Sequence, residues 1–205
     1  VHFMAETAKM LAPEKRVFLP NAAAGCPMAD MVTADKLLEM KAQFPDAVVV
    51  TYVNSSAAVK SVSDICCTSS NAVKIVNAIA SNEIIFVPDQ NLGQYVQKQC
   101  PDKTIHLWKG FCPTHHRVTR LETLTKINEI SDAVLFAHPE CRPEVLELAD
   151  FIGSTAQIIE ACKASDAKKI IIGTEQGVVD TLKKILPEKE FFMLDDHMVC
   201  KNMKK

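Results

Sequence analysis

The chain has 205 residues, of which 48% are hydrophobic and 23% are charged, with 23 lysines and arginines against 25 aspartates and glutamates. These values exclude a disordered, collagen-like or coiled-coil chain, and the near-neutral balance gives no basic surface for nucleic acid. No apolar run approaches the roughly 18 residues of a membrane span, and the first residues lack the pattern of a signal peptide, so we expect a cytoplasmic protein without a membrane partner.

Apolar spacing predicts alternating helices and strands along the chain. Uninterrupted apolar runs between helical segments are typical of parallel strands that are covered on both faces. We therefore predict an α/β fold built from small units with three parallel strands each. The expected helices are 31–44, 72–79, 118–130 and 156–162, and the expected strands are 47–50, 83–87, 104–108, 133–136, 169–172 and 191–194.

An internal repeat organises these elements. A shift of 86 positions places Cys26-Pro27 on Cys112-Pro113 and keeps residues 84–90 in register with 170–176, while Cys200 matches Cys112 at a shift of 88. We predict a second unit at residues 27–112 and a third at 113–200. Residues 1–26 match only the last part of a unit, so we expect them to be the remnant of a largely missing first unit. Residues 201–205 are expected to begin a truncated C-terminal segment.

Cysteine is the unusual residue of this composition. Eight cysteines are too few for a disulfide scaffold, and no Cys-x-x-Cys pair is present. Cys26, Cys112 and Cys200 each follow the closing strand of a unit, so they would converge if the units pack around a pseudo-threefold axis. Three convergent thiolates favour an iron–sulfur cluster or zinc. The other five cysteines have no such partners and are expected to be buried small hydrophobes (Cys66, Cys67, Cys100, Cys141 and Cys162).

Further polar residues follow the strands, where parallel sheets gather functional groups. Tyr52 and Asn54 in one unit correspond to His138 and Glu140 in the next, 86 positions later. His138 and Glu140 can form a proton-transfer pair, although a solvated loop is an equal alternative. His115 lies three residues after Cys112 and is expected close to the metal.

Hydroxyl-rich turns open two of the predicted helices. Residues 68–71 and 153–155 stand in matching places, and Thr174 and Glu175 lie in a third loop of this kind. Such hydroxyls can be helix N-caps alone. Together with free N–H groups at the helix start, they can also bind a phosphate or a dicarboxylate.

The motifs in this order resemble the quinolinate synthase (NadA) family over essentially the whole chain. The segments that carry the resemblance are Phe3–Ala8, Ala24–Asp30, Thr51–Asn54, Cys67–Ala72, Trp108–Cys112, His138–Cys141, Gly153–Thr155, Gly173–Glu175 and Cys200–Lys204. The resemblance implies three similar α/β domains around a pseudo-threefold axis. It also implies condensation of iminoaspartate with dihydroxyacetone phosphate to quinolinate, with loss of phosphate and water, in NAD biosynthesis.

The resemblance further implies a cofactor and residue roles. A [4Fe–4S] cluster would be held by Cys26, Cys112 and Cys200, with one open iron acting as a Lewis acid. Tyr52, His138 and Glu140 would be catalytic. The substrate-binding residues would be Asn54, Ser69, His115, Ser154, Thr155 and Thr174. The enzyme that produces iminoaspartate is a candidate partner.

Two other functions use the same thiolates. One is a zinc-dependent lyase or aldolase, and the other is a redox or iron-sensing module without catalysis. Metal analysis separates the first from the synthase, and the effect of removing the Glu140 carboxylate separates the second.

Overall fold

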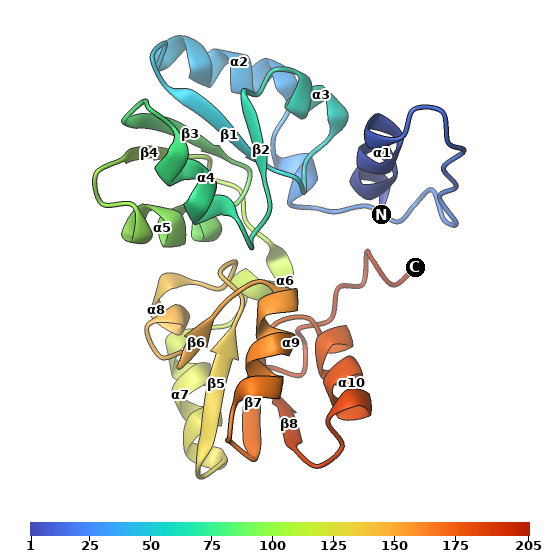
Figure 1. Cartoon of the computed structure of the whole chain (residues 1–205), viewed down its shortest axis with the longest axis vertical. Coiled ribbons are helices and arrows are strands. Elements are labelled where there is room, and N and C mark those ends of the chain that lie inside the picture. The colour runs from blue at the N-terminus through green and yellow to red at the C-terminus, as the bar shows by residue number, and fades with distance from the viewer. The chain divides into compact units, whose positions relative to one another are not determined.

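The computed structural model describes residues 1–205 as two compact α/β units. Unit 1 contains residues 1–112 with 201–205, and unit 2 contains residues 113–200. Each unit holds one parallel sheet of four strands, in the order β2-β1-β3-β4 in unit 1 and β6-β5-β7-β8 in unit 2 (Figure 1). The predicted class, an α/β fold of repeated parallel units, is confirmed. The boundaries expected at residues 26 and 200, and the pseudo-threefold arrangement, stay predictions.

In unit 1, helices and strands alternate after the first two helical segments. Its elements are α1 (His2–Leu11), the short 3-10 helix η1 (Ala29–Met31), α2 (Ala34–Gln43), β1 (Val48–Tyr52), α3 (Ala57–Ser61), β2 (Ile65–Cys67), α4 (Ala72–Ala78), β3 (Glu83–Val87), α5 (Gln90–Gln99) and β4 (Thr104–Leu107). Hydroxyl and carboxylate N-caps begin three of these helices, because their side chains accept backbone N–H groups that the first turn leaves unpaired (Thr33 for α2, Ser56 for α3 and Asp89 for α5).

Unit 2 repeats the same alternation. Its elements are α6 (Pro113–His116), α7 (Arg120–Glu129), β5 (Ala133–Ala137), α8 (Pro143–Leu146), β6 (Phe151–Ile152), α9 (Thr155–Ala164), β7 (Lys169–Gly173), α10 (Gln176–Ile185) and β8 (Glu190–Met193). Thr119 and Ser154 begin α7 and α9 with capping boxes, in which the N-cap side chain and the third helical residue each accept an N–H from the other's backbone.

The central strands of unit 1 are buried on both faces. Alternate residues of a strand point to opposite faces, so Val50 and Phe86 pack against α4 and α5, whereas Val49 and Ile85 pack against α2 and α3. All four side chains are fully buried. This two-sided burial explains why the strands appear in the sequence as continuous apolar runs rather than as an alternating pattern.

Each sheet contains one strand more than the three we predicted. β2 pairs with β1, and β6, only two residues long, pairs with β5. These strands lie at the edge of their sheets and are too short to give an apolar run. Ile65 and Cys66 of β2 are exposed, so the expectation that Cys66 is buried is wrong, whereas Cys67, Cys100, Cys141 and Cys162 are buried as expected.

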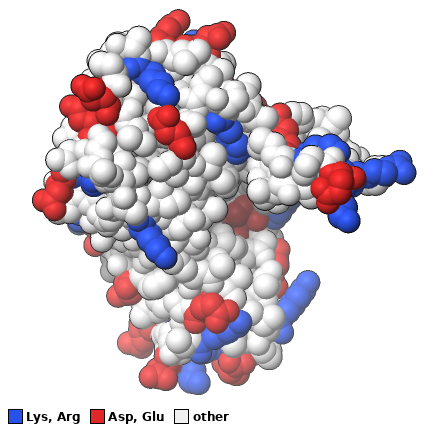
Figure 2. Space-filling view, turned by 45° about the horizontal axis from the view of Figure 1, so that its top comes forward, with Lys and Arg blue, Asp and Glu red and all other residues white.

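Charges are mixed on the molecular surface. On the face drawn in Figure 2, basic and acidic side chains lie scattered among one another, in keeping with the formal charge of −2. None of the helices combines the length and the apolar character that crossing a bilayer requires.

Gly110 provides a test of how tightly the loop after β4 is packed. A Cβ at this position would lie 2.4 Å from the Pro88 carbonyl oxygen, and the Gly110 carbonyl is itself held by the Gln90 N–H at 2.7 Å. Gly110→Ala should therefore lower the free energy of unfolding by about 1–3 kcal/mol. Gly25→Ala, where nothing lies within 4 Å of the added Cβ, is the control. Equal urea midpoints for the two variants would contradict this packing.

Candidate functional site

Unit 2 gathers four predicted site residues at the carboxyl ends of its strands. His138 and Glu140 follow β5, Thr174 follows β7, and His115 lies in α6. The His138 N–H donates to the Gly173 carbonyl at 3.0 Å, which ties the two strand-end loops together. All four residues are buried, with at most 7% of their surface exposed.

His115 is at the centre of this group because both of its ring nitrogens have partners. Nδ1 lies 2.9 Å from Glu140 Oε2, and Nε2 lies 2.9 Å from Thr174 Oγ1. An ionised carboxylate only accepts hydrogen bonds, so the Nδ1 proton is directed at Glu140. In this tautomer, Nε2 of His115 accepts the Thr174 hydroxyl proton. Thr174 and Glu140 together fix the plane and the tautomer of the ring.

His138 completes the group and is held in its neutral form. Burial is the main cause that lowers its pKa from 6.5 to about 4, and the neighbouring His115 acts in the same direction, while Glu140 opposes it. The Glu140 N–H donates to His138 Nδ1 at 3.2 Å, so the proton of the neutral ring is on Nε2. The two imidazole rings lie 4.9 Å apart between centroids.

This arrangement suits proton transfer in a water-poor environment. A carboxylate shared by a paired histidine and a neutral histidine can take up a proton and pass it on without moving far. Titratable groups with perturbed pKa values, such as His138, cluster at functional sites.

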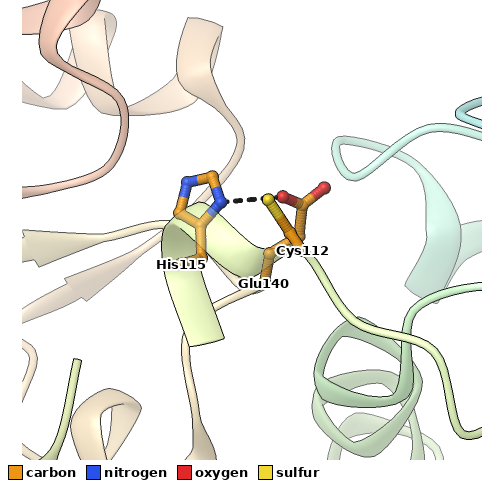
Figure 3. Close-up of side chains that lie close together, drawn as sticks. All are labelled: Cys112, His115 and Glu140. Atoms are coloured by element: carbon orange, nitrogen blue, oxygen red, sulfur yellow. Dashed lines mark ion pairs between the residues drawn. The ribbon is translucent and has the colours of Figure 1, made fainter. Parts of the chain in front are cut away.

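Cys112, which directly precedes α6, belongs to the same neighbourhood (Figure 3). Its Sγ, one His115 nitrogen and one Glu140 oxygen all lie within 4.8 Å of one another, so these three residues could hold a metal ion. Each His115 nitrogen already has a hydrogen-bond or ion-pair partner, however. A metal bound to His115 would have to replace one of these contacts.

The three cysteines expected as ligands are exposed to a similar extent. Cys26, Cys112 and Cys200 are half-buried and form no disulfide, whereas the other five cysteines are either buried or exposed. In unit 1, Cys26 and Cys112 both pack against the apolar cluster that contains Val50 and Phe86.

Tyr52 and Asn54 are expected to contact substrate; Tyr52 is the last residue of β1 in unit 1, and Asn54 lies two residues later. Tyr52 is buried, and its carbonyl accepts the Ser55 hydroxyl at 2.9 Å, while Asn54 is half-buried. These positions match those of His138 and Glu140 in unit 2, so the same loop carries a phenol and an amide in one unit and an imidazole and a carboxylate in the other.

The expected hydroxyl residues divide into two kinds. Ser154 is the N-cap of α9, where its side chain accepts the Gln157 N–H, and Thr155 is the exposed first residue of that helix. Ser69 lies half-buried in the turn before α4, whose N-cap residue is Asn71. Capping therefore accounts for Ser154 locally, whereas neither Ser69 nor Thr155 is the N-cap residue of its helix.

Comparison with known proteins identifies the family. A family model described as quinolinate synthetase A protein (NadA) matches residues 1–205. The chain is 54% identical over its whole length to a quinolinate synthase of Caldicellulosiruptor saccharolyticus and 55% identical to one of Alkaliphilus metalliredigens, covering 68% of each. It is 54% identical to that of Geotalea uraniireducens, covering 67% of it. The chain belongs to the quinolinate synthase family.

Family membership confirms the resemblance drawn from the sequence motifs, and the relatives are enzymes that act in NAD biosynthesis on small molecules. The roles of individual residues stay predictions. One residue of interest, Asp89, escaped the sequence analysis. It is fully buried and its carboxylate accepts the Cys112 N–H at 2.8 Å. The available signal was its position, because Asp89 lies 86 residues before Glu175 in the repeat.

The lowered pKa of His138 predicts a pH-dependent stability in this quinolinate synthase family member. The unfolded chain binds a proton at this histidine below pH 6.5, but the folded chain does so only near pH 4. The stabilisation is therefore present above pH 6.5 and lost as the pH falls toward 4. Between pH 7 and pH 5 this loss amounts to about 2 kcal/mol.

His138→Gln should remove the part of this decrease in stability that His138 causes. The measurement is the difference in the free energy of urea unfolding between pH 7 and pH 5. His197→Gln, which replaces an exposed histidine, is the control, and its unfolding free energy should decrease between pH 7 and pH 5 as much as that of the parent. An identical fall in His138→Gln and the parent would show that His138 is not held neutral.

Proposed function

We propose that this chain carries the quinolinate synthase activity of its family: condensation of iminoaspartate with dihydroxyacetone phosphate to quinolinate, with loss of phosphate and water. The observation that carries the proposal is that identity of 54–55% to quinolinate synthases extends over every part of the chain. The buried group of His115, His138, Glu140 and Thr174 supports it, because each condensation and dehydration step needs a proton to be removed or delivered.

The proposed cofactor is a [4Fe–4S] cluster, and the donor set fits it. Cys26, Cys112 and Cys200 are half-buried and form no disulfide, so all three are in the reduced state that ligation requires. Thiolates are the usual ligands of such clusters. When bound through three cysteines, the cluster would supply an open iron that acts as a Lewis acid on a substrate oxygen.

The protein's own residues would bind the substrates and handle their protons. Glu140 is placed to accept a proton, and it is oriented by the N–H of His115, whose own orientation Thr174 maintains. His138, neutral at physiological pH, would donate a hydrogen bond from Nε2. Tyr52 would act as a further acid or base, and Asn54 would orient the substrate.

The anionic groups of the substrates need hydrogen-bond donors. Ser69 and Thr155 both stand at or before the first turn of a helix, where backbone N–H groups favour anions. We assign carboxylate or phosphate binding to these two residues together with Ser154. Release of phosphate during the reaction would remove one of these anchoring interactions and favour departure of the products.

The chain's proposed partners follow from this chemistry. An imine such as iminoaspartate hydrolyses in water, so direct transfer from the enzyme that produces it would limit its loss. Both substrates are metabolites of the cell interior, and we propose a cytoplasmic location.

A zinc-dependent lyase is the second candidate, because Cys112, His115 and Glu140 could hold a single ion. Zinc binding there would cost the His115 contact to Glu140 or to Thr174, which is why the cluster is the preferred cofactor. Iron, sulfide and zinc counts after anaerobic purification separate the two.

Replacement of Glu140 tests catalysis separately from cofactor binding. Glu140→Gln should lower the rate of quinolinate formation by roughly 100-fold or more, because the amide cannot accept the proton. The iron and sulfide content and the visible absorbance should stay as in the parent. Glu147→Gln is the control, since Glu147 is an exposed carboxylate paired with Arg120. A fully active Glu140→Gln variant would show that Glu140 takes no part in the mechanism. If the protein were a non-catalytic redox or iron sensor, the substitution would change no measured rate.

Serine replacement of each ligand cysteine tests the cofactor. Cys26→Ser, Cys112→Ser and Cys200→Ser should each lose most of the iron, sulfide and visible absorbance after anaerobic purification, because a serine hydroxyl is a poor ligand for this cluster. Cys66→Ser, which replaces an exposed cysteine of β2, should retain all three. Full iron and sulfide content in any of the three ligand variants would exclude that cysteine as a ligand.

A further inference from the structure

We infer that Asp89 and Glu175 are positioning residues for two of the cysteines: each carboxylate holds the backbone N–H of the cysteine that closes its unit, Cys112 or Cys200, and so fixes that cysteine's loop. The name of the bound group, a cluster, rests on the proposed function. The contacts that hold the cysteine loops do not depend on it.

In unit 1, the Asp89 carboxylate joins a helix to the cysteine loop. Asp89 Oδ1 accepts the Leu92 N–H at 2.8 Å and so caps α5, while Oδ2 accepts the Cys112 N–H at 2.8 Å. The side chain is fully buried, and the positive end of the α5 dipole offsets the cost of burying its charge. The cysteine loop is therefore attached to the first turn of α5.

A second link runs beside the first. The Gln90 N–H donates to the Gly110 carbonyl at 2.7 Å, two residues before Cys112. Gly110 approaches the chain at Pro88 so closely that no side chain fits between them. The segment that leads into Cys112 is thus held by a backbone bond and by a carboxylate from consecutive residues.

Unit 2 builds the same pair of links with a different acid. Glu175 Oε2 accepts the Gly177 N–H at 2.7 Å at the start of α10, and Oε1 accepts the Cys200 N–H at 3.2 Å. The Gln176 N–H donates to the Met198 carbonyl at 3.0 Å, again two residues before the cysteine. The loop to Cys200 is two residues longer than the loop to Cys112, and the longer side chain of glutamate still reaches it.

Recurrence of the carboxylate in both units points to a task beyond capping. Serine or threonine caps a helix as well as aspartate does, and glutamate is not among the preferred N-caps. A residue that must cap the helix and also reach the cysteine N–H needs two acceptor atoms on one side chain, and a carboxylate has them. The residue that corresponds to both in the first part of the chain, Glu6, instead accepts the Ala57 N–H at 2.8 Å.

The contact also predicts an electronic effect on the bound group. Hydrogen bonds to the sulfur atoms and the charge around a cluster set its reduction potential. Each carboxylate occupies an N–H that would otherwise be free to donate to sulfur, and it adds a negative charge close to the thiolate. Both effects favour the oxidised cluster, so removal of either carboxylate should raise the reduction potential.

The test compares the reactivity of individual cysteines in the full-length, reduced, metal-free protein. Asp89→Asn should raise the rate of alkylation of Cys112 by iodoacetamide about three- to tenfold, because the loop that carries this thiol is no longer held at its backbone N–H, and leave Cys200 unchanged. Glu175→Gln should instead raise the rate of alkylation of Cys200 and leave that of Cys112 unchanged. Mass spectrometry of each cysteine peptide gives the rates.

Matched controls carry the same kind of bond elsewhere. Asp64 and Asp150 accept the N–H groups of Val49 and Leu135, each at 2.8 Å, and lie in neither cysteine loop. Asp64→Asn and Asp150→Asn should leave the alkylation of Cys112 and Cys200 unchanged. Asp89→Ser keeps a good N-cap but has no second acceptor atom, so it should behave like Asp89→Asn. It serves as the test variant if Asp89→Asn folds poorly.

A selective effect, on Cys112 alone in the Asp89 variants and on Cys200 alone in Glu175→Gln, supports the assignment. Equal changes at all cysteines, no change, or the same change in the controls would overturn it and leave the two acids with a merely structural role. The reduction potential of the anaerobically purified protein should rise in the same variants. If that protein holds no iron, the proposed cofactor fails, while the alkylation pattern still decides the positioning role.

Discussion

Two-sided burial of the central strands is the constraint on which the rest of the structure depends. Because helices cover both faces of β1 and β3, residues 49–50 and 84–87 of these strands are apolar and fully buried. The polar side chains of the two strands, Glu83, Thr51 and Tyr52, lie toward the strand ends. Residues 52–54 and 138–140 are such places, and the strand-end position explains why so many chemically active side chains lie in short segments.

Burial at the strand ends also determines the chemistry of unit 2. His115, His138, Glu140 and Thr174 are nearly as inaccessible as the core, so each polar atom requires a partner within the protein. Glu140 serves both histidines, and the competition between burial and its charge leaves His138 neutral. A base, a paired imidazole and a neutral imidazole thus arise from three residues in similar surroundings, because each has a different set of neighbours.

Most of the fold could be predicted from the sequence because its signals are local and repeated. The apolar runs at 83–87 and 169–172 gave their strands, and the shift of 86 positions gave the equivalence of the units. The edge strands β2 and β6 could not be predicted, since three and two residues are too short for a periodic pattern. The role of Asp89 could not be predicted either, because its bond to Cys112 spans 23 residues and involves a backbone group that no side-chain pattern reveals.

The repeat shows which interactions the fold needs and which it varies. Asp64 in unit 1 and Asp150 in unit 2 each accept the N–H of a strand residue. Asp89 and Glu175 each accept the N–H of a cysteine. Both units therefore contain the same two polar contacts in addition to a hydrophobic core. At the strand ends themselves the units differ, with tyrosine and asparagine in one and histidine and glutamate in the other. A scaffold that holds backbone N–H groups through carboxylates keeps the same loop geometry in both units while the side chains at the strand ends differ. Duplication of such a unit can therefore supply distinct acids, bases and ligands on loops of one geometry.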